Sequence, residues 1–347
     1  MIGAEIGLVT NDVLTPPPDA LLVVSFGGPE GPADVRPFLE KVTRGRNVPP
    51  GRLDEVERQY ALFGGVSPLG DECRRLCGAL EALLLREGPR LPVYLGQRHS
   101  APHLEDTLRR MARDGVRHAL AFVTSAYSSY PGCRQYLDDI EQARTAIGPD
   151  APVVEKLRPF WNHPGFIEPV ADALATAVRA SHSPGARTRI LFSAHSLPLA
   201  MARVCDYELQ LRAAAALVHQ RIPDAPPWEL VFQSRSGPAQ EPWLEPDIAE
   251  RMAGLAGEGV EHVLAAPLGF VLDHMEVVFD LDVRAAARAR EAGIGFARTA
   301  TPARDPRFVA MVRELVRERF DPELPLQALG ALGARPTPCT PGCCPPR

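Results

Sequence analysis

The strongest constraint on this chain is a regular alternation of short apolar runs with amphipathic segments. Runs at 21–24, 119–124 and 190–192 have the length and composition of buried parallel strands. Segments with helical periodicity separate these runs, and the alternation starts again at Ile190. Because each crossover helix returns the chain to the same end of a sheet, such alternation produces parallel sheets. The sequence therefore predicts an α/β protein built from two successive units.

Size and composition are those of an ordinary globular protein. The 347 residues fit two domains, with 45% hydrophobic and 23% charged residues. The net charge of −5 is spread along the chain, which gives no electrostatic case for binding nucleic acid. The first residues lack a signal peptide pattern, and no apolar run reaches the roughly 18 to 20 residues of a membrane span. We therefore expect a cytoplasmic protein.

The first predicted strand runs into a glycine turn, 25–29, which is a common opening of an α/β unit. It is not a dinucleotide-binding fingerprint, because the third glycine and the following acidic strand end are missing. Further along, Arg44 and Arg46 form a basic loop whose planar guanidinium groups suit carboxylates. A solvated pair of surface arginines would have the same sequence.

His195 follows the apolar run 190–192 within the polar stretch Ser-Ala-His-Ser, and Pro198 prevents a simple continuation of the strand. In an open α/β sheet, ligand-binding residues lie at the carboxyl ends of the strands. An imidazole in that position can accept a proton near neutral pH or bind a metal. A histidine that is only hydrogen-bonded at a strand end would give the same pattern.

A second polar group follows the strand at 263–266. Asp273, Glu276 and Asp280 are spaced to share one helical face, and His274 adjoins them. Such a stripe is usually a solvated surface, but here the flanks are apolar and follow directly from a strand. Carboxylates crowded in a poorly solvated place hold protons or a divalent cation. Since His195 follows a strand of the same unit, we expect both groups at one sheet edge.

Imidazole with carboxylates, and no obvious nucleophile, favours divalent metal handling or proton relay. Hydrolase and nucleotide-binding signatures are missing, namely G-x-S-x-G, H-E-x-x-H and the P-loop.

The seven cysteines are odd in number and unevenly spaced, unlike a disulfide scaffold. Three of them, Cys339, Cys343 and Cys344, crowd into the last nine residues. Cys73 and Cys77 share one face of a predicted helix, where cysteines are more often core residues than ligands.

Taken together, these motifs resemble the ferrochelatase family across roughly residues 20 to 322. The motifs that carry the resemblance are SFGGPE at 25–30, GGVSP at 64–68, FSAHSLP at 192–198, QSRSGP at 233–238 and the segment 269–282. The sequences of these motifs are most similar to those of the actinobacterial-like branch, whose members contain an iron–sulfur cluster.

The resemblance implies the chelatase fold, with two Rossmann-like domains, four-stranded parallel sheets and a porphyrin cleft between them. The expected divisions are an extension at 1–19, domains at 20–160 and 161–320, and a Pro/Cys-rich tail at 321–347.

The resemblance also implies an activity, the insertion of Fe²⁺ into a porphyrin in haem biosynthesis, which is a lyase reaction. His195 matches the active-site histidine and Glu276 the opposing carboxylate, and both are implied as metal-binding residues. His274 and Asp280 match a polar line that carries protons or metal. The residues that match the lining of the macrocycle or the holders of its propionates are Phe26, Arg44, Arg46, Ser67, Arg98 and Tyr127.

A [2Fe–2S] cluster is a further implication of the resemblance. Its thiolates would come from Cys133 and from Cys339, Cys343 and Cys344 of the tail. The C-x₃-C-C spacing departs from that of well-known members, and adjacent cysteines are sterically awkward on one cluster. The alternative is a disordered tail with free thiols.

Other functions remain open from the sequence. A cobalt or nickel chelatase of tetrapyrrole synthesis shares the fold, and a porphyrin or haem carrier would need the cleft without turnover. The partners implied are a porphyrin and ferrous iron, and peripheral contact with a membrane is left open. The sequence also leaves open protoporphyrin IX or coproporphyrin III as the substrate.

Overall fold

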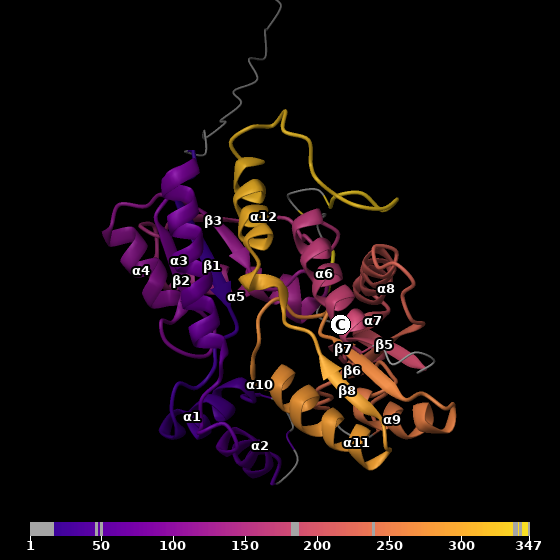
Figure 1. Ribbon diagram of the computed structural model, residues 1–347. Helices are drawn as coiled ribbons and strands as arrows, with labels where there is room; N and C mark the ends of the chain where they lie inside the picture. Colours follow the sequence, from indigo (N-terminus) through magenta and orange to yellow (C-terminus); the bar gives the residue numbers. More distant parts are fainter. Residues whose placement is uncertain are drawn as a thin grey trace, which may run out of the picture.

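The computed structural model describes residues 17–45, 48, 51–181, 187–237, 240–335, 339 and 342–345. This part of the chain forms two four-stranded parallel sheets, ordered β2-β1-β3-β4 and β6-β5-β7-β8, with helices on both faces (Figure 1). The predicted α/β class with parallel four-stranded sheets is confirmed.

The first sheet is built around its central strand. Every residue of β1 is buried, as expected for an apolar strand that is covered on both faces and paired on both edges. Its strands are β1 (Ala20–Ser25), β2 (Val93–Gln97), β3 (His118–Val123) and β4 (Val153–Lys156). Its helices are α1 (Pro32–Val42), α2 (Arg52–Ala61), α3 (Leu69–Glu87), α4 (Leu104–Arg113) and α5 (Gln135–Ile147), which is preceded by the π-helical turn η1 (Tyr130–Arg134).

The second sheet repeats this plan around β5, which pairs with β6 and β7. Its strands are β5 (Thr188–His195), β6 (Trp228–Gln233), β7 (His262–Ala266) and β8 (Gly295–Arg298). The α-helices of this half are α6 (Pro164–Ala180), α7 (Leu199–Ala202), α8 (Tyr207–His219), α9 (Ile248–Gly257), α10 (Met275–Val277), α11 (Ala286–Glu291) and α12 (Pro306–Arg317). A π-helix, η2 (Val278–Ala285), links α10 to α11, and the 3₁₀ turn η3 (Pro302–Arg304) precedes α12.

One apolar core runs between the two sheets. Helix α12 follows the second sheet in the chain but packs on both α3 and α6 (Figure 1). The ring of its Phe308 lies 6.2 Å from that of Phe122 on β3 and 5.9 Å from that of Phe160. The same buried cluster includes Phe192 of β5. The two halves are therefore joined through apolar side chains, and the expected domain boundaries stay a prediction.

The α1–α2 unit has a small core of its own. Val35, Phe38, Leu39 and Tyr60 pack together with Met275 of the second half, and Val278 and Phe279 of that half pack against them. This unit therefore covers the start of α10, next to the acidic segment identified in the sequence.

Among the described helices, none is long and apolar enough to cross a membrane.

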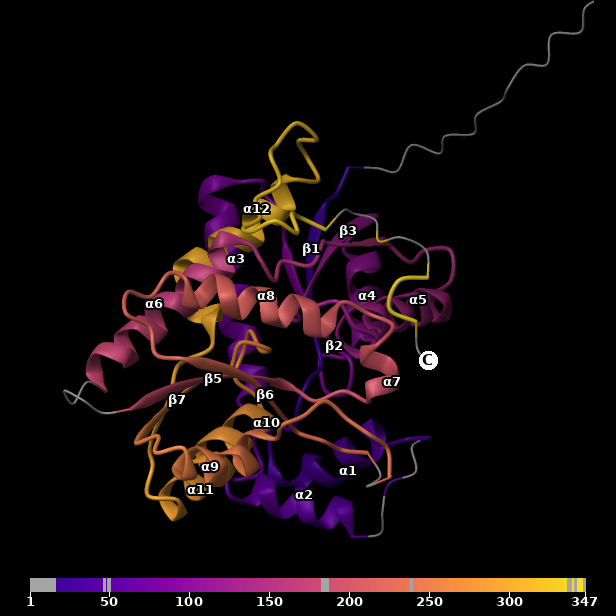
Figure 2. The same cartoon turned by 90° about the vertical axis from the view of Figure 1, so that its right-hand side faces the viewer.

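The segment after α12 is held by polar contacts with the loop after β4. Arg158 forms a two-bonded ion pair with Glu318, both bonds 2.8 Å long, with side chains 2% and 6% exposed. Arg158 also donates to the Gln327 carbonyl, and the Asn162 amide donates to the carbonyls of Leu329 and Gly333. These bonds direct the tail across the molecule, and Figure 2 shows its last described residues, in yellow, beside α5 and α7.

The Arg158–Glu318 pair provides a stability test. Glu318→Ala leaves a buried guanidinium without its partner, so we expect a loss of about 3–5 kcal/mol in the free energy of unfolding. The double variant Arg158→Met/Glu318→Leu removes both charges and should recover most of this loss. Denaturant unfolding measures both, with Glu30→Gln in the exposed Arg74–Glu30 pair as the control that changes little. A double variant as unstable as Glu318→Ala would contradict this account.

Candidate active site

Two neighbouring strands present the predicted site residues at one edge of the second sheet. His195 is the last residue of β5, and the loop that follows β7 leads to Glu276. That loop crosses β5 closely, because the Gly269 amide donates to the Ser193 carbonyl at 2.9 Å. A Cβ atom at Gly269 would lie 2.6 Å from the Cα of Ala194. A residue without a side chain is therefore needed for the two segments to meet.

His195 and Glu276 face each other. The His195 Nε2 lies 3.6 Å from the Glu276 Oε2, and the opposite ring nitrogen, Nδ1, lies 2.5 Å from the Ser196 carbonyl. A carbonyl can only accept, so Nδ1 carries a proton and donates it to Ser196. In the neutral ring, the lone pair is then on Nε2 and points toward Glu276. This nitrogen can accept a proton or bind a metal.

The surroundings of the pair shift both pKa values. The two side chains are 32% and 48% exposed, yet desolvation by the surrounding protein is the first influence on the pKa of each. Desolvation alone would lower the pKa of His195, but the charge and hydrogen bond of Glu276 outweigh it and raise that pKa. Desolvation is also outweighed at Glu276, where the imidazole lowers the pKa to about 2. Each group therefore favours the charged form of the other.

The acidic segment is not the one regular helix that its spacing predicts. His274 has an extended backbone and serves as the N-cap of α10, and the chain widens into a π-helix from Val278. Asp273 consequently lies outside the helix, and the spacing of the acidic residues no longer defines one stripe. A pattern of apolar and polar residues cannot distinguish α from π winding, because both bury one face.

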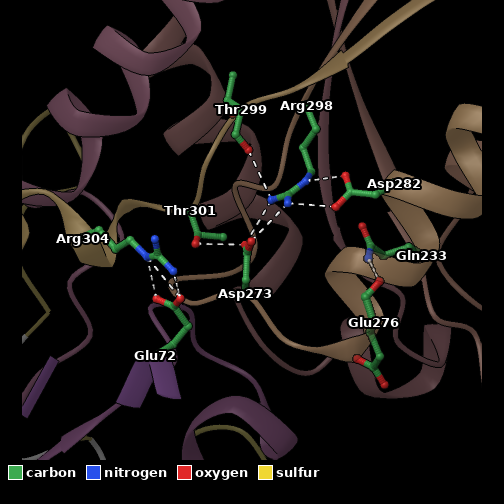
Figure 3. A network of polar contacts seen from close by, with 9 residues as sticks. All are labelled: Glu72, Gln233, Asp273, Glu276, Asp282, Arg298, Thr299, Thr301 and Arg304. Carbon is green, nitrogen blue, oxygen red and sulfur yellow. Dashed lines mark hydrogen bonds and ion pairs between the residues drawn. The ribbon is translucent and has the colours of Figure 1, made fainter. Parts of the chain in front are cut away.

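The four acidic residues of this segment have different surroundings. Asp273 is bound by Arg298, whereas Asp280 is 5% exposed and bound by Ser234 and Arg284. Desolvation raises the pKa of Asp280, although Ser234 and Arg284 oppose it. Desolvation lowers the pKa of His274, whose ring packs 4.9 Å from that of Phe270. Figure 3 shows the carboxylate of Glu276 directed away from the Arg298 network, whose other acidic member is Asp282.

The residues expected to line the substrate have mixed surroundings. Phe26 is half-buried against Phe38 and His99, and Arg44 is exposed just after α1. Ser67 is buried, with its side chain filling the space that a Cβ at Gly28 would need.

Arg98 and Tyr127 have protein partners for their polar groups. Arg98 is paired with Asp139, and the Tyr127 hydroxyl donates to the Leu268 carbonyl at 3.0 Å. Arg46 lies outside the described residues. The predicted contacts of all these residues with substrate stay predictions.

Two residues not predicted as site residues support the pair. The Gln233 amide donates to the Glu276 carbonyl at 2.9 Å, and the Tyr207 hydroxyl donates to the His195 carbonyl at 3.0 Å. Gln233 belongs to the QSRSGP motif at the end of β6, so the sequence carried a signal for it. Tyr207 begins an ordinary amphipathic helix, and nothing in its pattern distinguishes it from a core residue.

The tail thiols meet the internal cysteine. Cys133 and Cys339 are hydrogen-bonded, as are Cys339 with Cys343 and Cys343 with Cys344. Donation from Cys133 lowers the pKa of the Cys339 thiol to about 7. Within the described ranges, no group of three His, Cys, Asp or Glu residues could hold a metal ion. The thiols therefore form a series of pairwise contacts.

The His195–Glu276 pair predicts a pH dependence. A histidine whose pKa is raised by folding stabilises the folded chain at low pH, and this effect is lost as the pH rises through the folded-state pKa. A glutamate whose pKa is lowered by folding stabilises the folded chain at high pH, and this effect is lost as the pH falls through the folded-state pKa. The pair therefore contributes most between the ordinary values of 4.5 and 6.5. In Glu276→Gln the desolvation remains without the charge, so we expect the pKa of His195 to fall.

Titration of the imidazole carbon-bound protons by NMR measures this pKa. The control is Glu314→Gln, since Glu314 lies 3.2 Å from a different histidine, His163. An unchanged His195 titration in Glu276→Gln would show that the two groups do not interact.

Solved structures match the fold of this chain. CbiX, the terminal enzyme of siroheme biosynthesis in denitrifying bacteria, matches with a TM-score of 0.51 and 17% identity over 86% of this chain and 98% of its own. SirB from Bacillus subtilis with Fe³⁺ matches with a TM-score of 0.52 and 11% identity over 87% of this chain and 95% of its own. At these identities the likeness shows the fold alone.

Sequence relatives are much more similar. The coproporphyrin III ferrochelatase of Frankia alni is 52% identical over 95% of this chain and 87% of its own length, and that of Nocardia farcinica is 48% identical over 95% and 97%. The ferrochelatase of Rhodopirellula baltica is 48% identical over 95% and 94%. The model of the Ferrochelatase family matches residues 18–320. The resemblance seen in the motifs is confirmed, and the chain belongs to the ferrochelatase family.

Proposed function

We propose that this chain inserts Fe²⁺ into a porphyrin in haem biosynthesis and that His195 and Glu276 carry out the insertion. The observation that supports these roles is the 3.6 Å approach of the two partly exposed side chains. Family membership makes the chain a metal chelatase of the lyase class. It also makes ferrous iron a substrate rather than a resident cofactor.

The reaction exchanges one Fe²⁺ for the two pyrrole protons of the macrocycle, so the protein has to accept protons and hold the ion briefly. Neutral His195 accepts a proton at Nε2, while its Nδ1 stays bonded to Ser196. Glu276 stabilises the resulting imidazolium or presents a hard oxygen ligand to the ion. Because these roles need a neutral imidazole at the start, turnover should rise with pH through the raised pKa of His195.

His274 and Asp280 extend this polar site into the protein. Burial raises the pKa of Asp280, which makes this carboxyl a better proton acceptor than an exposed aspartate. We assign it, with His274, to the path by which protons leave. The described candidates for contact with the macrocycle are Phe26, Arg44, Ser67, Arg98 and Tyr127. Arg44 is the exposed cation among them.

We infer that the porphyrin is coproporphyrin III. The relatives from Frankia alni and Nocardia farcinica are named for this substrate. Coproporphyrin III carries more propionates than protoporphyrin IX, and exposed guanidinium groups such as that of Arg44 suit carboxylates.

An anaerobic assay tests the function directly. Purified chain is given Fe²⁺ with coproporphyrin III or with protoporphyrin IX, and the metallated product is followed by absorbance. We expect a higher kcat/KM with coproporphyrin III. Co²⁺ and Ni²⁺ are supplied in competition, and a preference for either would identify a different chelatase. Porphyrin binding without any metallation would identify a carrier.

His195→Ala isolates the role of the imidazole. The variant removes the proton acceptor but none of the other residues proposed to contact the macrocycle, so we expect porphyrin affinity to change little while metallation falls by at least about 100-fold. Fluorescence quenching measures binding, and the anaerobic assay measures turnover. The matched control is His219→Ala, a histidine on α8 whose Nε2 contacts the Pro226 carbonyl. Tight binding with retained turnover in His195→Ala would refute the assignment.

We also propose that Cys133, Cys339, Cys343 and Cys344 hold a [2Fe–2S] cluster. What supports this is the series of thiol contacts, together with the ordinary count of four thiolates for such a cluster. The tail is also anchored to the second half of the chain, where Arg335 pairs with Asp206. When bound, the cluster would supply one-electron exchange and a cross-link between the tail and the start of α5.

Cluster content is measurable in anaerobically purified protein. We expect about two irons and two acid-labile sulfides per chain, and a loss of both in Cys133→Ser. Cys77→Ser, on α3, should keep them, because Cys77 is not one of the four thiols. A colourless, iron-free wild-type preparation would contradict the proposal, as would a full cluster in Cys133→Ser.

A further inference from the structure

Arginines are distributed unequally over the acidic residues of the segment 273–282. Asp273 and Asp282 are both bound by Arg298, and Asp280 is bound by Arg284. In the described part of the chain, the remaining acid, Glu276, has an ion pair with His195 but none with an arginine. Within the described residues, the carboxylate that faces His195 is thus the one without an arginine in direct contact.

Arg298 is fully engaged. It is the last residue of β8, and its side chain is 16% exposed. Its Nη1 and Nη2 donate to the two oxygens of Asp273 at 3.0 and 3.1 Å, and its Nε and Nη2 donate to the two oxygens of Asp282 at 2.7 and 2.9 Å. The Thr301 hydroxyl adds a bond of 3.0 Å to Asp273 (Figure 3). One guanidinium therefore occupies both carboxylates.

The two anchored residues lie on either side of Glu276. Asp273 precedes the N-cap of α10, and Asp282 lies in the π-helix that follows it. Strand β8 pairs with β7, from which the whole segment emerges, so Arg298 reaches both ends from a rigid element. Together with the Gln233 bond to the Glu276 carbonyl, this fixes the backbone around Glu276.

Asp273 and Asp282 both accept from the Nη2 of Arg298, at 3.1 and 2.9 Å, so their carboxylates lie side by side on one guanidinium. Hard divalent ions take carboxylate oxygens as ligands, and a guanidinium excludes such ions by charge and by occupying the lone pairs. Without Arg298, Asp273 and Asp282 would offer a second place for a divalent ion on the segment that carries Glu276.

We propose that Arg298 is a positioning residue that keeps Asp273 and Asp282 from binding metal and thereby reserves Glu276 for the incoming iron. This role rests on the proposed function of Glu276 in metallation. It concerns which carboxylate the ion meets, whereas Arg298 itself does not touch the ion or the macrocycle.

The test compares two variants with the wild type. Arg298→Gln removes the guanidinium and leaves both carboxylates free. The triple variant Arg298→Gln/Asp273→Asn/Asp282→Asn also removes the guanidinium, but it replaces both carboxylates with neutral amides. Equilibrium dialysis with Zn²⁺, without porphyrin, should find one more bound ion in Arg298→Gln than in the wild type, and no additional ion in the triple variant. The kcat/KM for Fe²⁺ should fall by about tenfold or more in Arg298→Gln and recover to within about threefold in the triple variant.

The rescue distinguishes the proposal from a purely structural role. If Arg298 only holds the segment together, the triple variant lacks the same ion pairs and will be as impaired as Arg298→Gln, which would overturn the proposal. Equal Zn²⁺ binding in all three proteins would also overturn it.

Arg298→Lys covers the case in which Arg298→Gln does not fold. A single ammonium group cannot bond both carboxylates in the same way. We therefore expect the Zn²⁺ binding and the kcat/KM of Arg298→Lys to lie between those of the wild type and those of Arg298→Gln. Wild-type values in Arg298→Lys would show that the two-sided fork is unnecessary. Zn²⁺ binding is measured without turnover, so an inactive wild type would refute the proposed function while leaving this comparison intact.

Discussion

The site depends on the parallel pairing of β5 with its two neighbours, β6 and β7. Parallel strands end at the same edge, so the residues that follow them are brought together whatever their separation in the chain. His195 comes from β5, Gln233 from β6 and Glu276 from the loop after β7. The backbone bond from Gly269 to Ser193 then closes the distance between two of these segments. The approach of His195 to Glu276 is thus a consequence of hydrogen bonding in the sheet.

The sequence predicted the architecture well because its signal is periodic. Strands that are apolar on both faces and helices that are apolar on one face leave few alternatives to parallel sheets. The apolar run 190–192 and Pro198 were enough to place His195 at the end of a strand. The order of the strands within each sheet involves pairs that are far apart in the chain, and no local pattern encodes it. The same limit hid Tyr207, whose hydroxyl reaches His195 from a helix.

The acidic segment shows a different limit. Its spacing suggested one stripe of carboxylates, but an extended His274 and a π-helix separate Asp273 from Glu276. The arginines that decide the charge of each carboxylate lie on other elements, Arg298 on β8 among them. A carboxylate in a sequence reveals that a negative charge is available, while its partner determines whether the charge remains free. Only tertiary structure shows the partner.

The division of the apolar side chains into separate cores affects how easily the elements around the His195–Glu276 pair can move. The two sheets share one core through Phe122, Phe192 and Phe308, so swinging them apart would expose buried aromatic surface. The α1–α2 unit packs on a much smaller core, to which Met275, Val278 and Phe279 of the second half also contribute. Displacing α1 and α2 would therefore expose less buried apolar surface than separating the sheets, and it would break their contacts with α10 and the start of η2.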